Sequence, residues 1–173
     1  MKNILLTGRP GIGKTSIIKE VIDILKINAG GFYTREIREE EIRKGFEIIT
    51  LNGKRGILAH VDCRSPYRVS KYGVNIKDLE EVAAPAIEEA LRNKECIIID
   101  EIGRMELHSP KFCSLVKKAL DSEKRVLGTI QARHNEFLDS IRKREDTKII
   151  EVTFENRRKI VNEIKEILRW REP

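Results

Sequence analysis

Eight residues near the start of the chain have the types and spacing needed to hold phosphate groups: Gly8-Arg9-Pro10-Gly11-Ile12-Gly13-Lys14-Thr15. They fill every fixed position of the pattern Gly-x4-Gly-Lys-[Ser/Thr]. The glycines allow backbone N–H groups to line an anion nest. Lys14 can reach the β- and γ-phosphates of a nucleotide, and the Thr15 hydroxyl can ligate a Mg²⁺ ion that also contacts them. We therefore predict a nucleotide-binding loop from Gly8 to Ser16; the alternative is a glycine-rich turn that merely caps a helix.

A second group of residues suited to chemistry is the acidic pair Asp100-Glu101. It follows the aliphatic run Cys96 to Ile99, which predicts a buried strand that delivers both acids at its carboxyl end, where ligands bind in open α/β sheets. Asp100 is the candidate Mg²⁺ ligand beside Thr15, and capping of a strand or turn is its alternative role. A second acid is typical of phosphate-loop hydrolases with an added strand between the two motifs, in which it orients and deprotonates the attacking water. Lys14 and Glu101 are therefore candidate catalytic residues.

Three further kinds of side chain are candidates at the same edge of the predicted sheet. Thr129 or Gln131, at the end of a predicted strand, is a candidate to sense the γ-phosphate or the attacking water. Arg104, or an arginine between residues 133 and 144, is a candidate finger that stabilises the transferring phosphoryl group in cis. The charged run 35–44 is predicted to be an exposed connection; its alternative role is to bring Arg35, Glu36 or Arg38 to the nucleotide.

The phosphate loop requires a strand before it and a helix after it. Asn3 to Thr7 is a short apolar run typical of a buried strand, and apolar residues recur at helical spacing from Ile17 to Leu25. Gly30-Gly31 is predicted to end this helical unit. The predicted strands that follow are 32–37, 45–51 and 54–61, with a hairpin turn at Asn52-Gly53.

The rest of the chain alternates predicted helices with predicted strands. After a loop at 63–72, the predicted elements are a helix from the cap Asn75 to Asn93 with a candidate kink at Pro85, the strand 96–99, a helix 111–121 begun by Ser109-Pro110, a strand 125–131, a helix 134–144, a strand 148–152, and a helix from Phe154 to Trp170 capped by Thr153. Such alternation implies right-handed βαβ crossovers. We expect an α/β fold in one domain, residues 1–173, with a mainly parallel sheet, helices on both faces and an antiparallel β addition.

Composition narrows the class of protein. The net charge of +6 permits contact with nucleic acid, but charges of both signs are interspersed and make up 36% of residues, so a solvated surface is the preferred interpretation. The three cysteines are far apart, and the chain shows neither a signal peptide pattern nor a membrane span. We expect a soluble, cytoplasmic monomer whose only cofactor is Mg²⁺.

The chain resembles the THEP-type nucleoside-triphosphatase family, found in thermophiles and, in animals, as the cancer-related nucleoside triphosphatase. The matching stretches are residues 8–15, Gly31-Phe32-Tyr33-Thr34 with Glu36 and Arg38, Tyr72-Gly73-Val74-Asn75, residues 100–107 (Asp-Glu-Ile-Gly-Arg-Met-Glu-Leu), and Val152-Thr153-Phe154-Glu155-Asn156-Arg157. The resemblance implies a RecA-like phosphate-loop NTPase fold and slow, Mg²⁺-dependent hydrolysis of several nucleoside triphosphates to diphosphates. Arg104 stands where that family frequently has Lys, and Phe154 where it frequently has Pro at a first helical turn.

Two other classes of function stay open. A nucleotide or nucleoside kinase would use the basic segment 133–144 as a lid over two phosphorylated substrates, although Glu101 argues against a kinase. A GTP-dependent switch would use Asp100-Glu101-Ile102-Gly103 as Asp-x-x-Gly, yet the chain has no Asn-Lys-x-Asp sequence to recognise guanine.

Overall fold

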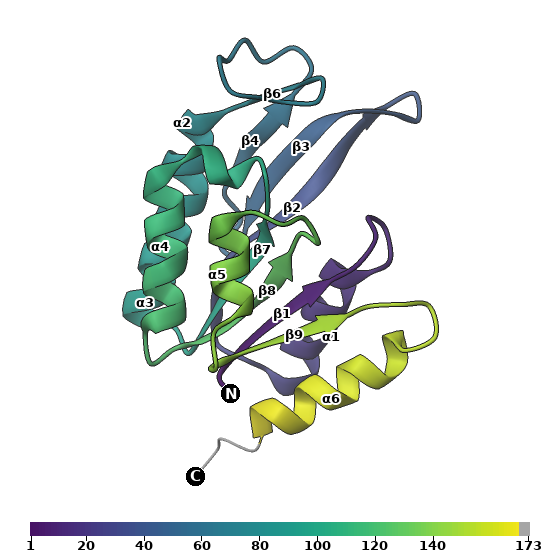
Figure 1. Cartoon of the computed structure of the whole chain (residues 1–173), viewed down its shortest axis with the longest axis vertical. Helices are drawn as coiled ribbons and strands as arrows, with labels where there is room; N and C mark the ends of the chain where they lie inside the picture. Colours follow the sequence, from purple (N-terminus) through teal and green to yellow (C-terminus); the bar gives the residue numbers. More distant parts are fainter. Residues whose placement is uncertain (170–173) are drawn as a thin grey trace.

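The computed structural model describes residues 1–169. Within them, nine strands form one sheet in the order β5-β6-β4-β3-β2-β7-β8-β1-β9 (Figure 1). The strands are β1 (Asn3–Thr7), β2 (Ala29–Glu39), β3 (Ile42–Thr50), β4 (Arg55–His60), β5 (Arg68–Val69), β6 (Tyr72–Val74), β7 (Cys96–Ile102), β8 (Arg125–Ile130) and β9 (Thr147–Glu151). The helices are α1 (Lys14–Leu25), α2 (Ile76–Asp78), α3 (Ala84–Asn93), α4 (Pro110–Asp121), α5 (Glu136–Arg142) and α6 (Arg157–Arg169).

The strands β2, β7, β8, β1 and β9 run parallel and carry the phosphate loop. β8 lies between β1 and β7 although it follows both in the chain, which is the order expected of a RecA-like fold. Because the carboxyl ends of parallel strands meet at one edge, the residues that follow β1, β7 and β8 come together there. The predicted parallel sheet is confirmed.

Helices cover both faces of this parallel half (Figure 1). Alternate residues of the buried strands point to opposite faces, so each strand contributes to two apolar layers. One layer joins Leu5, Ile97, Ile99 and Val126 to residues of α3, α4 and α5. The other joins Ile4, Leu6, Ile98 and Leu127 to residues of α1 and α6. Among the helices in residues 1–169, none combines the length and the apolar character that a membrane span needs.

The antiparallel addition is confirmed, but the connection predicted at 35–44 is wrong. β2 continues to Glu39 and β3 begins at Ile42, so only Glu40-Glu41 forms the turn, with both residues at positive φ. The charged residues lie within the two strands and pair there: Arg35 with Glu47 across the strands, and Glu36 with Arg38 and Arg43. Cross-strand ion pairs let an exposed ribbon accommodate charges that otherwise indicate a loop. Arg35, Glu36 and Arg38 are therefore engaged with this ribbon.

Several predicted boundaries differ from the structure. Gly30-Gly31 lies inside β2, and α1 ends instead at Leu25; the capping residue Lys26 has a left-handed backbone and donates its N–H to the Ile22 carbonyl. The predicted loop 63–72 contains β5, which pairs with β6. The Asn75 and Ser109 caps are confirmed. The helix after Asn75 is interrupted by a π-helical turn, Leu79–Ala83, immediately before Pro85, rather than by a simple kink.

Two helices are also shorter than predicted. The helix expected at 134–144 is α5, which begins at Glu136 after the cap Asn135 and ends at Arg142. The last helix begins at Arg157 instead of Phe154, because Thr153 and Asn156 exchange hydrogen bonds in a turn before it (2.7 and 3.3 Å). Trp170, its predicted end, lies outside the described residues.

Replacement of Gly31 by Ala should strongly destabilise the fold. Gly31 has a φ of +111°, and an added Cβ would lie 2.0 Å from the Ile98 carbonyl oxygen in β7. Strain and overpacking together should lower the free energy of unfolding by at least about 3 kcal/mol. Gly53→Ala is the matched control, because Gly53 also has positive φ but an added Cβ would meet nothing within 4 Å. It should cost only about 1–2 kcal/mol of strain. Guanidinium denaturation measures both, and equal losses would contradict the clash.

Candidate active site

The predicted phosphate loop lies between β1 and α1, at the carboxyl edge of the parallel strands. Gly8, Gly11 and Gly13 all have positive φ, and α1 begins at Lys14, so the amino end of the helix faces the loop. The Lys14 ammonium donates to the carbonyl oxygens of Gly8 (2.7 Å) and Arg9 (3.1 Å). Backbone donors, a helix amino end and an ammonium group thus converge on a single concave loop, which suits a polyphosphate.

The Asp100 carboxylate joins this loop to the neighbouring strands. It is buried and accepts hydrogen bonds from the hydroxyl of Thr15, in the loop, and from that of Thr129, in β8 (2.7 Å for Thr129). Burial raises the pKa of Asp100 above its usual range, while Thr15, Thr129 and the Lys14 charge act in the opposite direction. Thr129, which with Gln131 is a candidate sensor of the γ-phosphate, donates its hydroxyl to Asp100 in this structure.

The oxygen atoms of Thr15 and Asp100 suit a Mg²⁺ ion. Hydroxyl and carboxylate oxygens are the ligands that this hard cation prefers, and it commonly uses one or two protein groups together with substrate phosphates and water. Within residues 1–169 no group of three His, Cys, Asp or Glu side chains could hold a metal by itself. The donor set therefore fits a metal that arrives with a phosphorylated substrate rather than one held in an all-protein cage.

Glu101 lies at the same edge, beside Asp100, in an environment that favours its protonated form. Burial, and secondly the charge of Asp100, raise the pKa of Glu101 to about 7; Lys14 and a hydrogen bond with Gln131 oppose this rise. The Gln131 side chain also accepts from the backbone N–H of Arg104 (2.9 Å). Gln131 thus links the end of β8 to Glu101 and to the turn after β7. A carboxylate with a pKa near neutrality is well matched to accept a proton in catalysis.

Glu106 is a member of this cluster that the sequence reasoning missed. Its side chain is buried in the 3-10 turn Glu106–His108, and burial, then the charge of Glu101, raise its pKa well above the usual range. Glu106 lies in the stretch 100–107 that carries the family resemblance, and that was the only sequence signal for it. Three carboxyl groups therefore crowd the edge where β7 ends.

Known proteins are similar to the chain over almost its whole length. The family model described as NTPase matches residues 3–165 of the chain. The chain belongs to this nucleoside-triphosphatase family. It is 52% identical over 167 residues to the nucleoside-triphosphatase THEP1 of Thermotoga maritima, covering 96% of this chain and 95% of that protein. The human cancer-related nucleoside-triphosphatase is 36% identical over 183 residues, covering 94% of each.

Solved structures of family members share the fold. The crystal structure of THEP1 from the hyperthermophile Aquifex aeolicus aligns with a TM-score of 0.86 at 39% identity, covering 96% of this chain and 98% of that one. The solution structure of a human cancer-related nucleoside triphosphatase aligns with a TM-score of 0.83 at 34% identity over the whole of both chains. The family predicted from the sequence motifs is confirmed, and the chain is an enzyme of the nucleoside-triphosphatase family.

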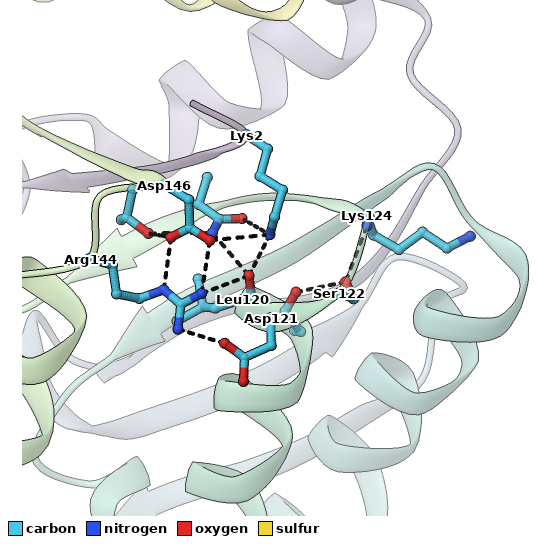
Figure 2. Close-up of polar contacts among 10 residues, drawn as sticks. Lys2, Leu120, Asp121, Ser122, Lys124, Arg144 and Asp146 are labelled. Carbon is cyan, nitrogen blue, oxygen red and sulfur yellow. Dashed lines mark hydrogen bonds and ion pairs between the residues drawn. The ribbon is translucent and has the colours of Figure 1, made fainter.

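Arg144, one of the arginines proposed as fingers, has other partners. Arg144 donates to Asp121 (2.7 Å), Asp146 (2.8 and 2.9 Å) and the Leu120 carbonyl (3.1 Å), as Figure 2 shows. This network raises the pKa of Arg144 and lowers that of Asp146 to about 2. It lies where β1, β8 and β9 begin, at the edge of the sheet opposite the phosphate loop. Arg144 therefore links the end of α4 to the start of β9 at the amino edge of the sheet and is not a finger.

The remaining candidates lie nearer the loop. Arg142 pairs with Asp139 (2.8 Å) and donates to the Gln131 carbonyl, so it braces the segment after β8. Arg104 and Arg133 follow β7 and β8 directly, and within the described chain no hydrogen bond or ion pair fixes either guanidinium. Of the arginines predicted as fingers, these two keep that role as candidates.

A further arginine that the sequence reasoning gave no role lies against the phosphate loop. The Arg157 guanidinium, at the start of α6, packs on Gly13 so closely that a Cβ on Gly13 would lie 3.0 Å from it. Arg157 is part of the family stretch 152–157, but only the packing of α6 beside α1 places it here. The loop therefore has carboxylates on its β7 side and a guanidinium on its α6 side.

In the metal-free protein, Glu101→Gln should raise stability at alkaline pH. The pKa of Glu101 in the folded chain, about 7, exceeds its ordinary value of 4.5, so this group favours folding at low pH and that contribution is lost as the pH rises to 7. The variant should be more stable than wild type at pH 8, by on the order of 1–3 kcal/mol, and nearly equal at pH 5. Denaturant titrations at both pH values measure this, with the exposed Glu123→Gln as control. Equal stability at pH 8 would contradict the burial of a charged Glu101.

Proposed function

We propose that the chain hydrolyses several nucleoside triphosphates, among them ATP, GTP, CTP and UTP, to the diphosphate and phosphate, with Mg²⁺ as cofactor. The observation that carries this proposal is the position of Glu101 at the carboxyl end of β7, where burial and the charge of Asp100 raise its pKa. It stands directly after Asp100, which is hydrogen-bonded to the phosphate loop through Thr15. A group poised to take a proton beside a phosphate site supports water as the acceptor of the phosphoryl group.

In this proposal the loop Gly8 to Ser16 binds the phosphates, and Lys14 stabilises the charge that develops on the γ-phosphate. Thr15 and Asp100 hold the metal ion. When bound, Mg²⁺ neutralises charge on the β- and γ-phosphate oxygens. The hydrogen bond between Thr15 and Asp100 keeps both ligands at the same side of the loop before a substrate arrives.

The proposed reaction is in-line attack of water on the γ-phosphorus. The bond from that phosphorus to the oxygen it shares with the β-phosphate breaks, and the nucleoside diphosphate leaves. Glu101 accepts the proton of the attacking water, and Gln131 orients Glu101 through their hydrogen bond. We expect slow turnover, because an arginine finger is worth about 10³- to 10⁵-fold and neither Arg104 nor Arg133 is anchored in the described chain.

The kinase alternative loses its main support in this structure. It required the basic segment 133–144 as a lid over a second phosphorylated substrate. Arg144 is paired at the opposite edge of the sheet, and Arg142 is paired with Asp139. The positive charge available to bind an acceptor is therefore smaller than the sequence suggested.

Replacement of Glu101 by Gln tests hydrolysis against phosphoryl transfer to another acceptor. The variant keeps the size and hydrogen bonding of Glu101 but cannot accept the proton, so phosphate release at saturating nucleotide should fall by about 10²- to 10⁴-fold. Nucleotide binding, measured by titration calorimetry, should persist or tighten. Lys14→Ala is the companion variant, and it should lose turnover because the loop loses its phosphate-directed ammonium group. Hydrolysis by Glu101→Gln within a few-fold of wild type would contradict the proposed base.

Broad base tolerance is a separate expectation. All the assigned groups contact phosphate or metal, so kcat/KM for ATP, GTP, CTP and UTP should differ only modestly. Discrimination above about a thousandfold, roughly 4 kcal/mol, would require hydrogen bonds to base edges. Phosphate release measured with the four nucleotides in turn tests this, and strong preference for one base would overturn it.

A further inference from the structure

A cavity of about 670 Å³ adjoins the phosphate loop on the side away from β7 and β8. The first turn of α1 lines it with Ser16 and Glu20, and the turn before α6 and α6 itself contribute Phe154, Arg157 and Asn162. Its volume lies within the range of about 300–1,000 Å³ that is usual for small-molecule sites. None of the roles proposed above for the site uses this cavity.

The position of the cavity fits the direction in which a bound nucleotide must extend. Asp100 and Glu101 lie near the carboxyl end of β7, and Thr129 lies near that of β8, so the γ-phosphate and its attacking water belong on that side of β1. β9 pairs with the other side of β1 and leads into the turn before α6. A triphosphate whose γ end faces β7 therefore directs its nucleoside toward β9 and α6, where the cavity lies.

Ser16 and Arg157 make the phosphate loop and the cavity continuous. Ser16 is both the last residue of the predicted loop and part of the cavity wall. Arg157 also lines the cavity, and its guanidinium packs on Gly13 within the loop. A positive group at this junction suits the inner phosphate of a nucleotide that spans both.

Phe154 is the most unusual residue of the cavity. Its side chain is 79% exposed, more than any other large hydrophobic side chain in the described residues. It lies in the turn fixed by the exchange of hydrogen bonds between Thr153 and Asn156, which holds its backbone in place. An exposed aromatic ring on an ordered turn beside a cavity is well suited to stack against a planar ligand.

We propose that this cavity is the nucleoside subsite of the enzyme and that the Phe154 ring stacks on the base, while Arg157 contacts the phosphate nearest the ribose. This inference rests on the proposed function, because it assumes that the phosphate loop holds a triphosphate. Stacking uses the face of a base, which purines and pyrimidines share, rather than the edges that distinguish them. Phe154 therefore provides affinity without strong discrimination among bases.

The test compares ligands with and without a base. Titration calorimetry would measure the binding of ATP, GTP, CTP and UTP, and of inorganic tripolyphosphate, to wild type, Phe154→Ala and Phe154→Tyr, all with Mg²⁺. Phe154→Ala should weaken binding of all four nucleotides by about 5- to 150-fold, the range expected for loss of one stacked base, and leave tripolyphosphate unchanged. Phe154→Tyr keeps the ring and should bind like wild type. In phosphate-release assays, Phe154→Ala should raise KM and keep kcat, as expected for an interaction made equally in ground and transition states.

The matched control is Tyr67→Ala. Tyr67 is another exposed aromatic residue, but its ring packs against His108 and does not line the cavity, so its loss should change no nucleotide affinity. Equal nucleotide binding by wild type and Phe154→Ala would overturn the subsite and leave the proposed hydrolysis standing. If Phe154→Ala weakened the binding of tripolyphosphate as much as that of the nucleotides, the subsite would also be overturned, because the effect would then lie in the phosphate loop. Failure of wild type to bind any nucleotide would overturn the proposed function as well.

Discussion

The active edge of this enzyme depends on one buried carboxylate. The Asp100 carboxylate accepts one hydrogen bond from the hydroxyl of Thr15, in the phosphate loop, and another from the hydroxyl of Thr129, in β8. These contacts require β8 to lie between β1 and β7, so the order of the strands and the geometry of the site are the same constraint. A buried carboxylate without partners would be costly, and the two hydroxyls offset part of that cost while they fix the loop against the sheet. Displacement of either neighbouring strand would separate the loop from both acids.

Three carboxyl groups lie at the same edge of the sheet, and their burial there does not stabilise the fold. Burial raises the pKa of Asp100, Glu101 and Glu106; the charge of Asp100 further raises the pKa of Glu101, and the charges of Glu101 and Asp100 further raise that of Glu106. A cluster of this kind lowers the free energy of unfolding above neutral pH, and the proposed metal ion would offset this repulsion. The positive charge of Lys14 acts in the opposite direction and lowers the pKa of both Asp100 and Glu101. This charge distribution supports the proposal that a metal ion accompanies the phosphorylated substrate.

Local patterns made much of this architecture predictable, and the errors come from tertiary placement. Patterns of neighbouring residues define the phosphate loop, the acids at the carboxyl end of β7 and the helix caps Asn75 and Ser109. These features could therefore be predicted from the sequence. The ribbon of β2 and β3 was mistaken for a connection because its charges are satisfied across strands, which spacing along the chain does not show. Arg144 was misplaced for a geometric reason. A helix that follows the carboxyl end of β8 returns to the amino edge of the sheet, so the residues after α5 lie far from the loop.

In the proposed complex, the two sides of β1 receive different parts of the substrate. Every nucleoside triphosphate presents the same phosphates, and the groups proposed to act on them lie at the carboxyl ends of β7 and β8. The base varies, and the side toward β9 and α6 offers it an open cavity with one exposed aromatic ring. Residues that bind the base can then change without disturbing the junction of Thr15, Asp100 and Thr129. In the proposed arrangement, contacts with the base depend on exposed residues such as Phe154, which can change at low cost in stability, whereas hydrolysis of the γ-phosphate depends on the buried order of the strands.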